Sequence, residues 1–481
     1  GLEITSSSNY NNITANHVHN NTAGIKLQGS SNNNLTENKV EDNSNYGIYL
    51  YSSASHNNLT NNECHDNNDS APLTEDYDIY LNDGCNYNTL YGNNCSSSSN
   101  TIGIYLHDND GGTESEYNTL INNICNGYDS RSRGIEIHSS NNTLTNNTCD
   151  DNYFGIVVRS SSYVNITNST CNSNRDVGIH LIGSSRNNIT NNTCSYNSNE
   201  GIYLKNDNSD DNDLDNNTCL ENGKYGIYFN DQCEHNNLTN NTCTNNSIYG
   251  IFLNDQCENN TLHNNTCCNS TYGILISSNN CTISNNTVRF NKVGIRLSNS
   301  EYCTLENNTA ANNFRGSGAQ SGINLFQSSY NNITNNIVSN NNETGYGIRL
   351  YDTSCHNLIK NNTADNNSYY GIFLYTSCSD NYVYNNTVTN NSIFGLSVST
   401  DSNNNIIRNN TIENNTLYGI RLLSSQDNII YNNYLNNTDN AYDDSSNSWN
   451  TTQQAGTNII EGSYLAGNYY HDYSGLDAND D

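Results

Sequence analysis

The sequence predicts an all-β fold, a single-stranded right-handed parallel β-helix of about 18 coils with three short strands in each coil. One repeat recurs along the chain, and the glycines that open successive copies between Gly134 and Gly294 are 21 to 25 residues apart. Each of these glycines begins a Gly-Ile-x-Leu segment or a variant of it with Ile, Val or Phe in place of Leu, in which buried and outward positions alternate as in a strand with one buried face. The only proline among 481 residues is Pro72, so almost every copy is free of strand breakers.

The remainder of each copy predicts two further strands and two turns. The copy at 178–200 reads GIHLIGSSRNNITNNTCSYNSNE, with Asn-Asn before an Ile or Leu and Asn-Asn-Thr before a Cys or Val. Because stacked coils bring equivalent residues together, we expect the asparagines to form amide ladders at the turns. The repeats occupy 1–440, and the segment 441–481 departs from the repeat, so we expect it to cap the solenoid or to dock onto another subunit.

The 17 cysteines fall mainly into two repeat positions. The first position follows Asn-Asn-Thr and is taken by Val or Ala in later copies, which indicates small buried residues that form a cysteine ladder. The second lies in the first turn, where an exported protein would form some disulfides whose pairing the sequence leaves open. Its candidates are Cys233, Cys257, Cys281, Cys303, Cys355 and Cys378. No Cys-x-x-Cys pair occurs and we find no repeat position shared by the 11 histidines, so a metal cluster is not expected.

The residue between Ile and Leu of each Gly-Ile-x-Leu strand should point to solvent, because side chains alternate across a strand. In the first two thirds of the chain this position is mostly aromatic, and in later copies it becomes mixed. An exposed apolar stripe usually marks a contact surface, either for a second copy of the chain or for sugar rings. The members of this outer stripe are Tyr49, Tyr80, Tyr105, Tyr203, Tyr228 and Phe252.

The formal charge of −31 makes nucleic acid and anionic membranes poor partners. No apolar run reaches the ~18–20 residues of a transmembrane helix. The chain contains no methionine, so we expect a removed leader, with Gly1 as the first mature residue, and export to the cell surface. Some Asn-x-Ser/Thr sequons would then carry glycans. The candidates for N-glycosylation are Asn12, Asn34, Asn58, Asn165 and Asn188.

The Gly-Ile-x-Leu and Asn-x-Ile-x-Asn-Asn repeat resembles the NosD-type parallel β-helix repeats. The tail NIIEGSYLAGNYYHDYSGLDANDD, from Asn458, resembles the end segment of that group, with Tyr470 in place of a tryptophan. The resemblance implies a surface or secreted protein of methanogenic archaea, related to carbohydrate-binding and sugar-hydrolase β-helices. Asp477, Asn479 and Asp481 have the spacing of the first oxygen ligands in a calcium loop, and a solvated acidic tail is the alternative.

No set of residues typical of a polysaccharide-cleaving β-helix is present, and adjacent acids such as Asp150 and Asp151 are expected by chance among 48 acidic residues. The predicted function is therefore a non-enzymatic structural subunit of an extracellular filament, sheath or layer, which associates with itself through its coil ends and the outer stripe. The alternative is a secreted carbohydrate-binding or carbohydrate-modifying protein. Metal delivery, the third hypothesis, has no expected ligand cluster.

Overall fold

The computed structural model confirms the predicted right-handed β-solenoid, with about 17 turns and no helix among its described residues. The chain divides into two compact units, Gly1–Ser247 and Ile248–Asp481. The structure describes residues 1–5, 7–67, 76–97, 101–108, 113–127, 131–206, 208–314, 318 and 320–472. Within these ranges no helical segment could serve as a transmembrane span.

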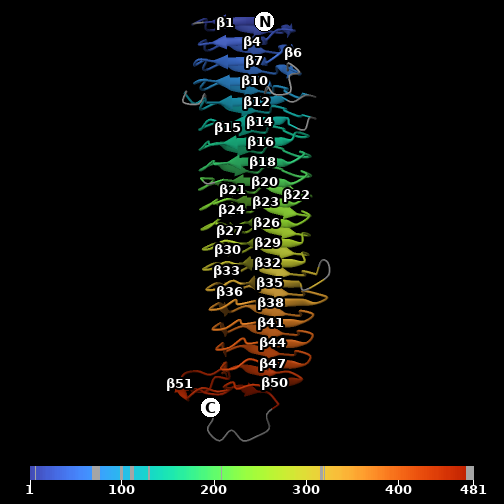
Figure 1. Ribbon diagram of the computed structural model, residues 1–481, viewed down its shortest axis with the longest axis vertical. Helices are drawn as coiled ribbons and strands as arrows, with labels where there is room; N and C mark the ends of the chain where they lie inside the picture. The colour runs from blue at the N-terminus through green and yellow to red at the C-terminus, as the bar shows by residue number, and fades with distance from the viewer. Residues whose placement is uncertain are drawn as a thin grey trace. The chain divides into compact units, whose positions relative to one another are not determined.

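The Gly-Ile-x-Leu segments form a parallel sheet in each unit, in which each strand lies beside its equivalent in the next coil (Figure 1). In the first unit the register pairs Ile104 with Ile135. The strands of this sheet are β1 (Leu2–Thr5), β4 (Ala23–Gln28), β7 (Tyr46–Tyr51), β10 (Asp76–Asn82), β12 (Thr101–His107), β14 (Arg133–Ile137), β16 (Phe154–Arg159), β18 (Val177–Ile182), β20 (Glu200–Lys205) and β23 (Tyr225–Asn230).

The second unit has the same arrangement, with Ile295 paired to Ile323. Its strands are β26 (Tyr249–Leu253), β29 (Tyr272–Ile276), β32 (Val293–Ser298), β35 (Gln320–Phe326), β38 (Gly345–Tyr351), β41 (Tyr370–Tyr375), β44 (Phe394–Ser399), β47 (Tyr418–Leu423) and β50 (Asp439–Asp443).

Two further sets of short parallel strands complete the coils. The segments after Asn-Asn form three-residue strands such as β15 (Thr143–Thr145) and β17 (Asn165–Thr167), which pair in register. The segments after the second Asn-Asn form strands such as β22 (Thr218–Leu220) and β25 (Thr242–Thr244). In several coils of the first unit this third segment is reduced to a single bridge, as between Thr148 and Thr170. The expected three strands per coil are therefore present in only part of the described chain.

The repeat glycine is required by the close approach of neighbouring coils. A Cβ on Gly178 would lie 2.6 Å from the carbonyl oxygen of Gly201, much closer than such atoms can approach. The isoleucine and leucine that follow the glycine are buried. The cysteines that follow Asn-Asn-Thr, such as Cys194, are buried as well. A narrow column of Ile, Leu, Val and Cys thus forms the core of each unit.

Asparagine ladders satisfy the backbone at the turns, as the sequence predicts. Asn362 is buried, and its amide nitrogen donates to the carbonyl of Ile333 at 2.8 Å and to Asn386 Oδ1 at 3.0 Å. The Oδ1 atom of Asn362 in turn accepts from the backbone and side-chain amides of Asn336. A neighbouring turn residue is often left-handed, such as Asn361 with φ of 56°, a conformation that asparagine tolerates.

The C-terminal segment folds back onto the last coil of the second unit. Its strand β53 (Tyr469–Tyr470) pairs in parallel with β49 (Tyr434–Asn436), and Asn468 continues the asparagine ladder by accepting from Asn433. An antiparallel pair, β51 (Gln454–Ala455) and β52 (Tyr464–Leu465), lies in the same segment. The described part of this segment therefore extends the sheets of its unit, while docking onto another subunit stays a prediction.

Candidate metal centre

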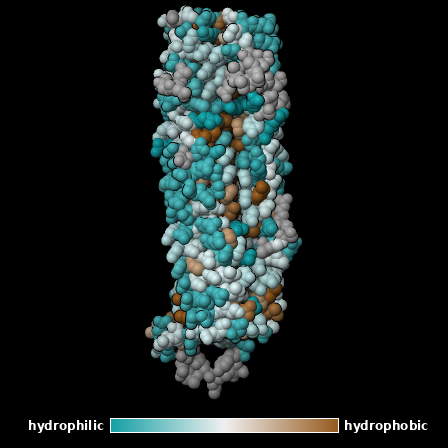
Figure 2. All heavy atoms as spheres, viewed as in Figure 1, coloured by the Kyte–Doolittle hydropathy of each residue, from teal (hydrophilic) through white to brown (hydrophobic). Residues whose placement is uncertain are grey.

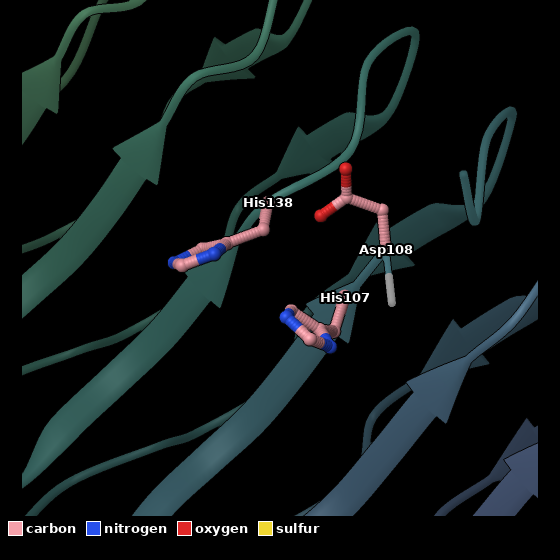
Figure 3. Close-up of side chains that lie close together, drawn as sticks. All are labelled: His107, Asp108 and His138. Atoms are coloured by element: carbon pink, nitrogen blue, oxygen red, sulfur yellow. The ribbon is translucent and has the colours of Figure 1, made fainter. Parts of the chain in front are cut away.

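Two histidines and one aspartate from adjacent coils of the first unit lie close together (Figure 3). His107 ends β12 and is followed by Asp108, while His138 follows directly after β14. Because β12 and β14 pair in register, the two imidazoles lie side by side, and the Asp108 carboxylate is directed to the same side. One nitrogen of each imidazole and one carboxylate oxygen all lie within 4.8 Å of one another, and the three side chains are half-buried.

A buried carboxylate orients one of these histidines. The Oε1 atom of Glu136 accepts from His138 Nε2 at 2.8 Å, and its Oε2 atom accepts from Arg133 Nη1 at 2.7 Å. Burial by itself would raise the pKa of Glu136, but the hydrogen bond from His138 and the charges of Arg133 and Arg159 outweigh it and lower this pKa. Glu136 is therefore an ionised acceptor that holds the imidazole of His138 in one orientation.

The hydrogen bond to Glu136 also fixes which nitrogen of His138 can bind an ion. With the proton on Nε2, the lone pair of the ring lies on Nδ1, and the hydroxyl of Tyr105 is 3.4 Å from that atom. On the adjacent coil the hydroxyl of Tyr80 lies 3.2 Å from His107 Nδ1. A carboxylate behind a histidine is the arrangement that commonly supports metal-binding imidazoles.

Two imidazoles and one carboxylate are the donors that Zn²⁺, Cu²⁺, Ni²⁺ and Fe²⁺ prefer. Two ligands bound to one ion at about 2.0–2.1 Å can be at most ~4.2 Å apart, so atoms that lie within 4.8 Å of one another need at most a small side-chain rotation to bind one ion. Three protein ligands would leave coordination positions open for water or another ligand.

The 11 histidines do not recur together at one repeat position, but two of them share a position. His107 is the fourth residue after Gly103, and His138 is the fourth residue after Gly134, so both occupy the same position of consecutive copies. The signal was present in the sequence, but the long copy that starts at Gly103 separates the two histidines by 31 residues. Alignment on the repeat glycine brings them together.

The outer stripe is more buried than the sequence predicts. Tyr80 and Tyr105 are only 7% and 5% exposed, because Tyr46 and Tyr77 from the position before the repeat glycine pack against them. Tyr49 stacks on Tyr80 with ring centroids 5.1 Å apart. Figure 2 shows small apolar patches among hydrophilic atoms on this face of the molecule.

The other members of the stripe are half-buried. Tyr203 and Tyr228 stack in the first unit with centroids 4.9 Å apart, and Phe252 lies 4.8 Å from the ring of Tyr249 in the second unit. The expected freely exposed stripe is therefore an aromatic layer covering the outer face of the sheet.

The structure assigns no disulfide to any of the 17 cysteines, including the six candidates, namely Cys233, Cys257, Cys281, Cys303, Cys355 and Cys378. A thiol–thiol hydrogen bond lowers the pKa of Cys281 and raises that of Cys303. Four of the sequon asparagines are exposed, namely Asn12, Asn34, Asn58 and Asn188, while Asn165 is half-buried. The candidate calcium residues Asp477, Asn479 and Asp481 lie outside the described residues.

Two family models match the chain. The model described as periplasmic copper-binding protein (NosD) matches residues 207–344 and 312–475, and the model of the right-handed β-helix region matches 1–124 and 115–267. The histidine cluster lies in the part matched by the β-helix model. In the described part of 207–475, no three metal-binding side chains of His, Cys, Asp or Glu lie together.

Several solved structures are similar to this chain at low identity and low TM-score. The DFA-IIIase from Arthrobacter chlorophenolicus A6 is 11% identical with a TM-score of 0.38, covering 57% of this chain and 83% of its own. The periplasmic alginate epimerase AlgG is 13% identical with a TM-score of 0.26, and the match covers 89% of this chain and 77% of the epimerase chain. The catalytic domain of a GH87 α-1,3-glucanase is 13% identical with a TM-score of 0.32, and the match covers 67% of this chain and 60% of the glucanase chain.

A search of curated proteins finds no match. The family models together extend from the first residue to residue 475, and the NosD model alone matches more than half of the chain. The repeat, the fold and these matches agree, and the chain belongs to the NosD family of right-handed β-helix proteins.

Proposed function

We propose that this chain is an exported β-helical protein that binds one divalent transition-metal ion through His107, Asp108 and His138. The observation that carries the proposal is the convergence of these three donors on adjacent coils, with the Glu136 carboxylate behind His138. The family description, which names a periplasmic copper-binding protein, supports export and the choice of metal, while the NosD model matches residues 207–475 and so does not include these three side chains.

Copper(II) is the ion that this donor set fits best. The two imidazole nitrogens and the Asp108 oxygen match the preference of Cu²⁺ for nitrogen and oxygen ligands, and Cu²⁺ forms the strongest complexes among the divalent first-row metals. His107 and His138 bind the ion, Asp108 neutralises part of its charge, and Glu136 keeps His138 in the binding orientation. The half-buried position gives the ion access from solvent.

The test is a calorimetric titration of the full chain with Cu²⁺ and with Zn²⁺, in excess Ca²⁺ to saturate the acidic surface. We expect one strong site, and the variants His107→Asn and His138→Asn should weaken it by more than about 100-fold, because loss of a ligand costs at least as much as loss of its supporting group. Asn230 and Asn254 occupy the repeat position that His107 and His138 occupy in their own copies, so the fold accepts asparagine there. The control His235→Asn changes an exposed histidine outside the cluster. Equal affinity of the His138→Asn variant would contradict the proposal.

We also infer that the protein serves as a non-enzymatic structural subunit of an extracellular filament, sheath or layer. The supporting observation is a set of exposed aromatic rings stacked on adjacent coils, such as Tyr87 and Tyr117, which are 51% and 47% exposed with centroids 5.1 Å apart. Electron microscopy of the purified protein with and without a chelator tests this role. Regular assemblies are expected, whereas dispersed molecules at high concentration would contradict it and favour saccharide binding.

A further inference from the structure

The outer face of the main sheet in the second unit carries two arginines that flank an asparagine. Arg296 on β32, Asn324 on β35 and Arg349 on β38 occupy the same strand position on three consecutive coils. Strands in a sheet are ~4.8 Å apart, so the two arginine backbones are separated by about 9.6 Å. We refer to these three residues as the arginine platform.

Aromatic rings hold both guanidinium groups. Arg296 Cζ lies 5.0 Å from the ring centroid of Phe326, and Arg349 Cζ lies 4.3 Å from that of Tyr351 and 5.1 Å from that of Tyr346. Arg296 Nη2 also donates to the Tyr351 hydroxyl at 3.2 Å, which links the two arginines. The guanidinium planes are therefore positioned by the protein rather than free in solvent.

Neither arginine has an acidic partner among the residues that the structure describes. This is unexpected in a chain with 48 acidic and 17 basic residues, and it contrasts with Arg186, which lies 3.5 Å from Asp211. Both guanidinium groups lie against aromatic side chains instead. The platform is thus a local cationic site on an otherwise acidic protein.

Two buried polar atoms of the platform also lack hydrogen bonds. Asn324 is 4% exposed, and its Oδ1 atom has no hydrogen-bond partner. The buried Nε atom of Arg349 also has no hydrogen-bond partner. A buried polar group without a partner is unfavourable, so the fold keeps hydrogen-bonding capacity here that it does not use itself. A ligand with hydroxyl and acidic groups would supply both partners after a rotation of these side chains, because neither atom is open to solvent in the structure.

We propose that the arginine platform binds an acidic saccharide. Carboxylate or sulfate groups would accept hydrogen bonds from Arg296 and Arg349, and ring hydroxyls would bond the Asn324 amide. The apolar edges of the flanking rings, Phe326 and Tyr351, would contact the C–H face of a sugar ring. A long, uniformly charged polyanion such as nucleic acid fits less well, because the rest of this acidic chain repels it. The site lies in the unit that does not contain the metal centre.

The experiment measures binding of a galacturonate hexasaccharide, neutral maltohexaose and inorganic sulfate to the full chain by calorimetry. We expect the acidic hexasaccharide to bind and maltohexaose not to bind. The variants Arg296→Gln and Arg349→Gln should each weaken binding by at least about tenfold. The matched control Arg186→Gln should leave the affinity unchanged.

The proposal is overturned if the acidic hexasaccharide does not bind, if it binds the double variant as strongly as the original chain, or if maltohexaose binds equally well. Sulfate binding with the same affinity would show a simple anion site and would also overturn it. A second measurement covers variants that fail to fold: bound hexasaccharide should protect Arg296 and Arg349 of the original chain from phenylglyoxal, as read by mass spectrometry. Unchanged modification of both arginines would contradict the proposal.

Discussion

Glu136 Oε1 and His138 Nε2 lie 2.8 Å apart, so a buried carboxylate fixes an imidazole of the proposed metal centre. The substitution Glu136→Gln keeps the size of the side chain but removes its charge, and the amide can present its nitrogen to the ring. We expect Cu²⁺ affinity to fall by about 10–100-fold, as for other groups that support a ligand. Calorimetry measures the affinity, and circular dichroism confirms that the variant is folded. Unchanged affinity would mean that Glu136 serves only Arg133 and Arg159.

The repeat glycine cannot be replaced where coils approach closely. A Cβ on Gly250 would lie 2.5 Å from the carbonyl oxygen of Gly273, a backbone atom that cannot move without separating the coils. We expect Gly250→Ala to lower the free energy of unfolding by about 1–3 kcal/mol or more. Gly467 is the control, because an added Cβ there meets no atom within 4 Å. Urea unfolding of both variants checks the difference, and equal stability would contradict it.

Each asparagine of the buried ladder satisfies several backbone groups at once. In the variant Asn362→Ala the carbonyl of Ile333 and the amide of Asn336 lose their side-chain partners. We expect a loss of about 2–4 kcal/mol in the free energy of unfolding, because at least two buried groups remain unsatisfied. The adjacent exposed residue gives a control, Asn361→Gly, since glycine also accepts its left-handed backbone. A similar loss in both variants would contradict a special role of the ladder.

Glu200 should make stability depend on pH. Burial, with the nearby charge of Asp176, raises the pKa of Glu200 to about 7, although Lys224 opposes this shift. Because this folded-state pKa exceeds the ordinary value of 4.5, the folded chain binds more protons than the unfolded chain between these pH values. The contribution of Glu200 to stability is therefore fully present below about pH 4.5 and is lost as pH rises through 7, by at most about 3 kcal/mol.

Melting curves at pH 5 and pH 8 check this dependence. The variant Glu200→Gln cannot ionise, so its melting temperature should fall less between the two pH values than that of the original chain. The exposed Glu221→Gln variant should behave like the original chain. If Glu200→Gln shows the full pH dependence, another group is responsible.

Most thiols should be protected in the folded protein. Of the 17 cysteines only Cys268 and Cys355 are half-buried, and burial raises the pKa of both thiols. A thiol reagent such as DTNB should therefore label at most these two in the native protein, slowly, and all free thiols after unfolding. Rapid native labelling of Cys219 would contradict the buried ladder. Fewer thiols after unfolding would reveal the disulfides predicted in the first turn.

The sequence predicts the repetitive parts of this fold well, because stacking places equivalent residues together. The pairing of Ile104 with Ile135 follows directly from their place after the repeat glycine. The burial of Tyr80 was missed, because strand alternation gives the side of the sheet but not the packing of a second aromatic column against it. The metal centre was missed for a different reason, since His107 and His138 become neighbours only when copies of unequal length are aligned.

The proposed metal centre depends on two particular copies being adjacent, which would limit how this chain can grow or shrink by duplication. A whole extra copy inserted elsewhere in the first unit would leave β12 and β14 paired, and the three ligands would stay together. The same copy inserted between them would separate His107 from His138 by one more strand spacing, to about 9.6 Å, which no single ion can span. Recombination between repeats is therefore tolerated through most of the array, while the junction between these two coils must be inherited as a unit.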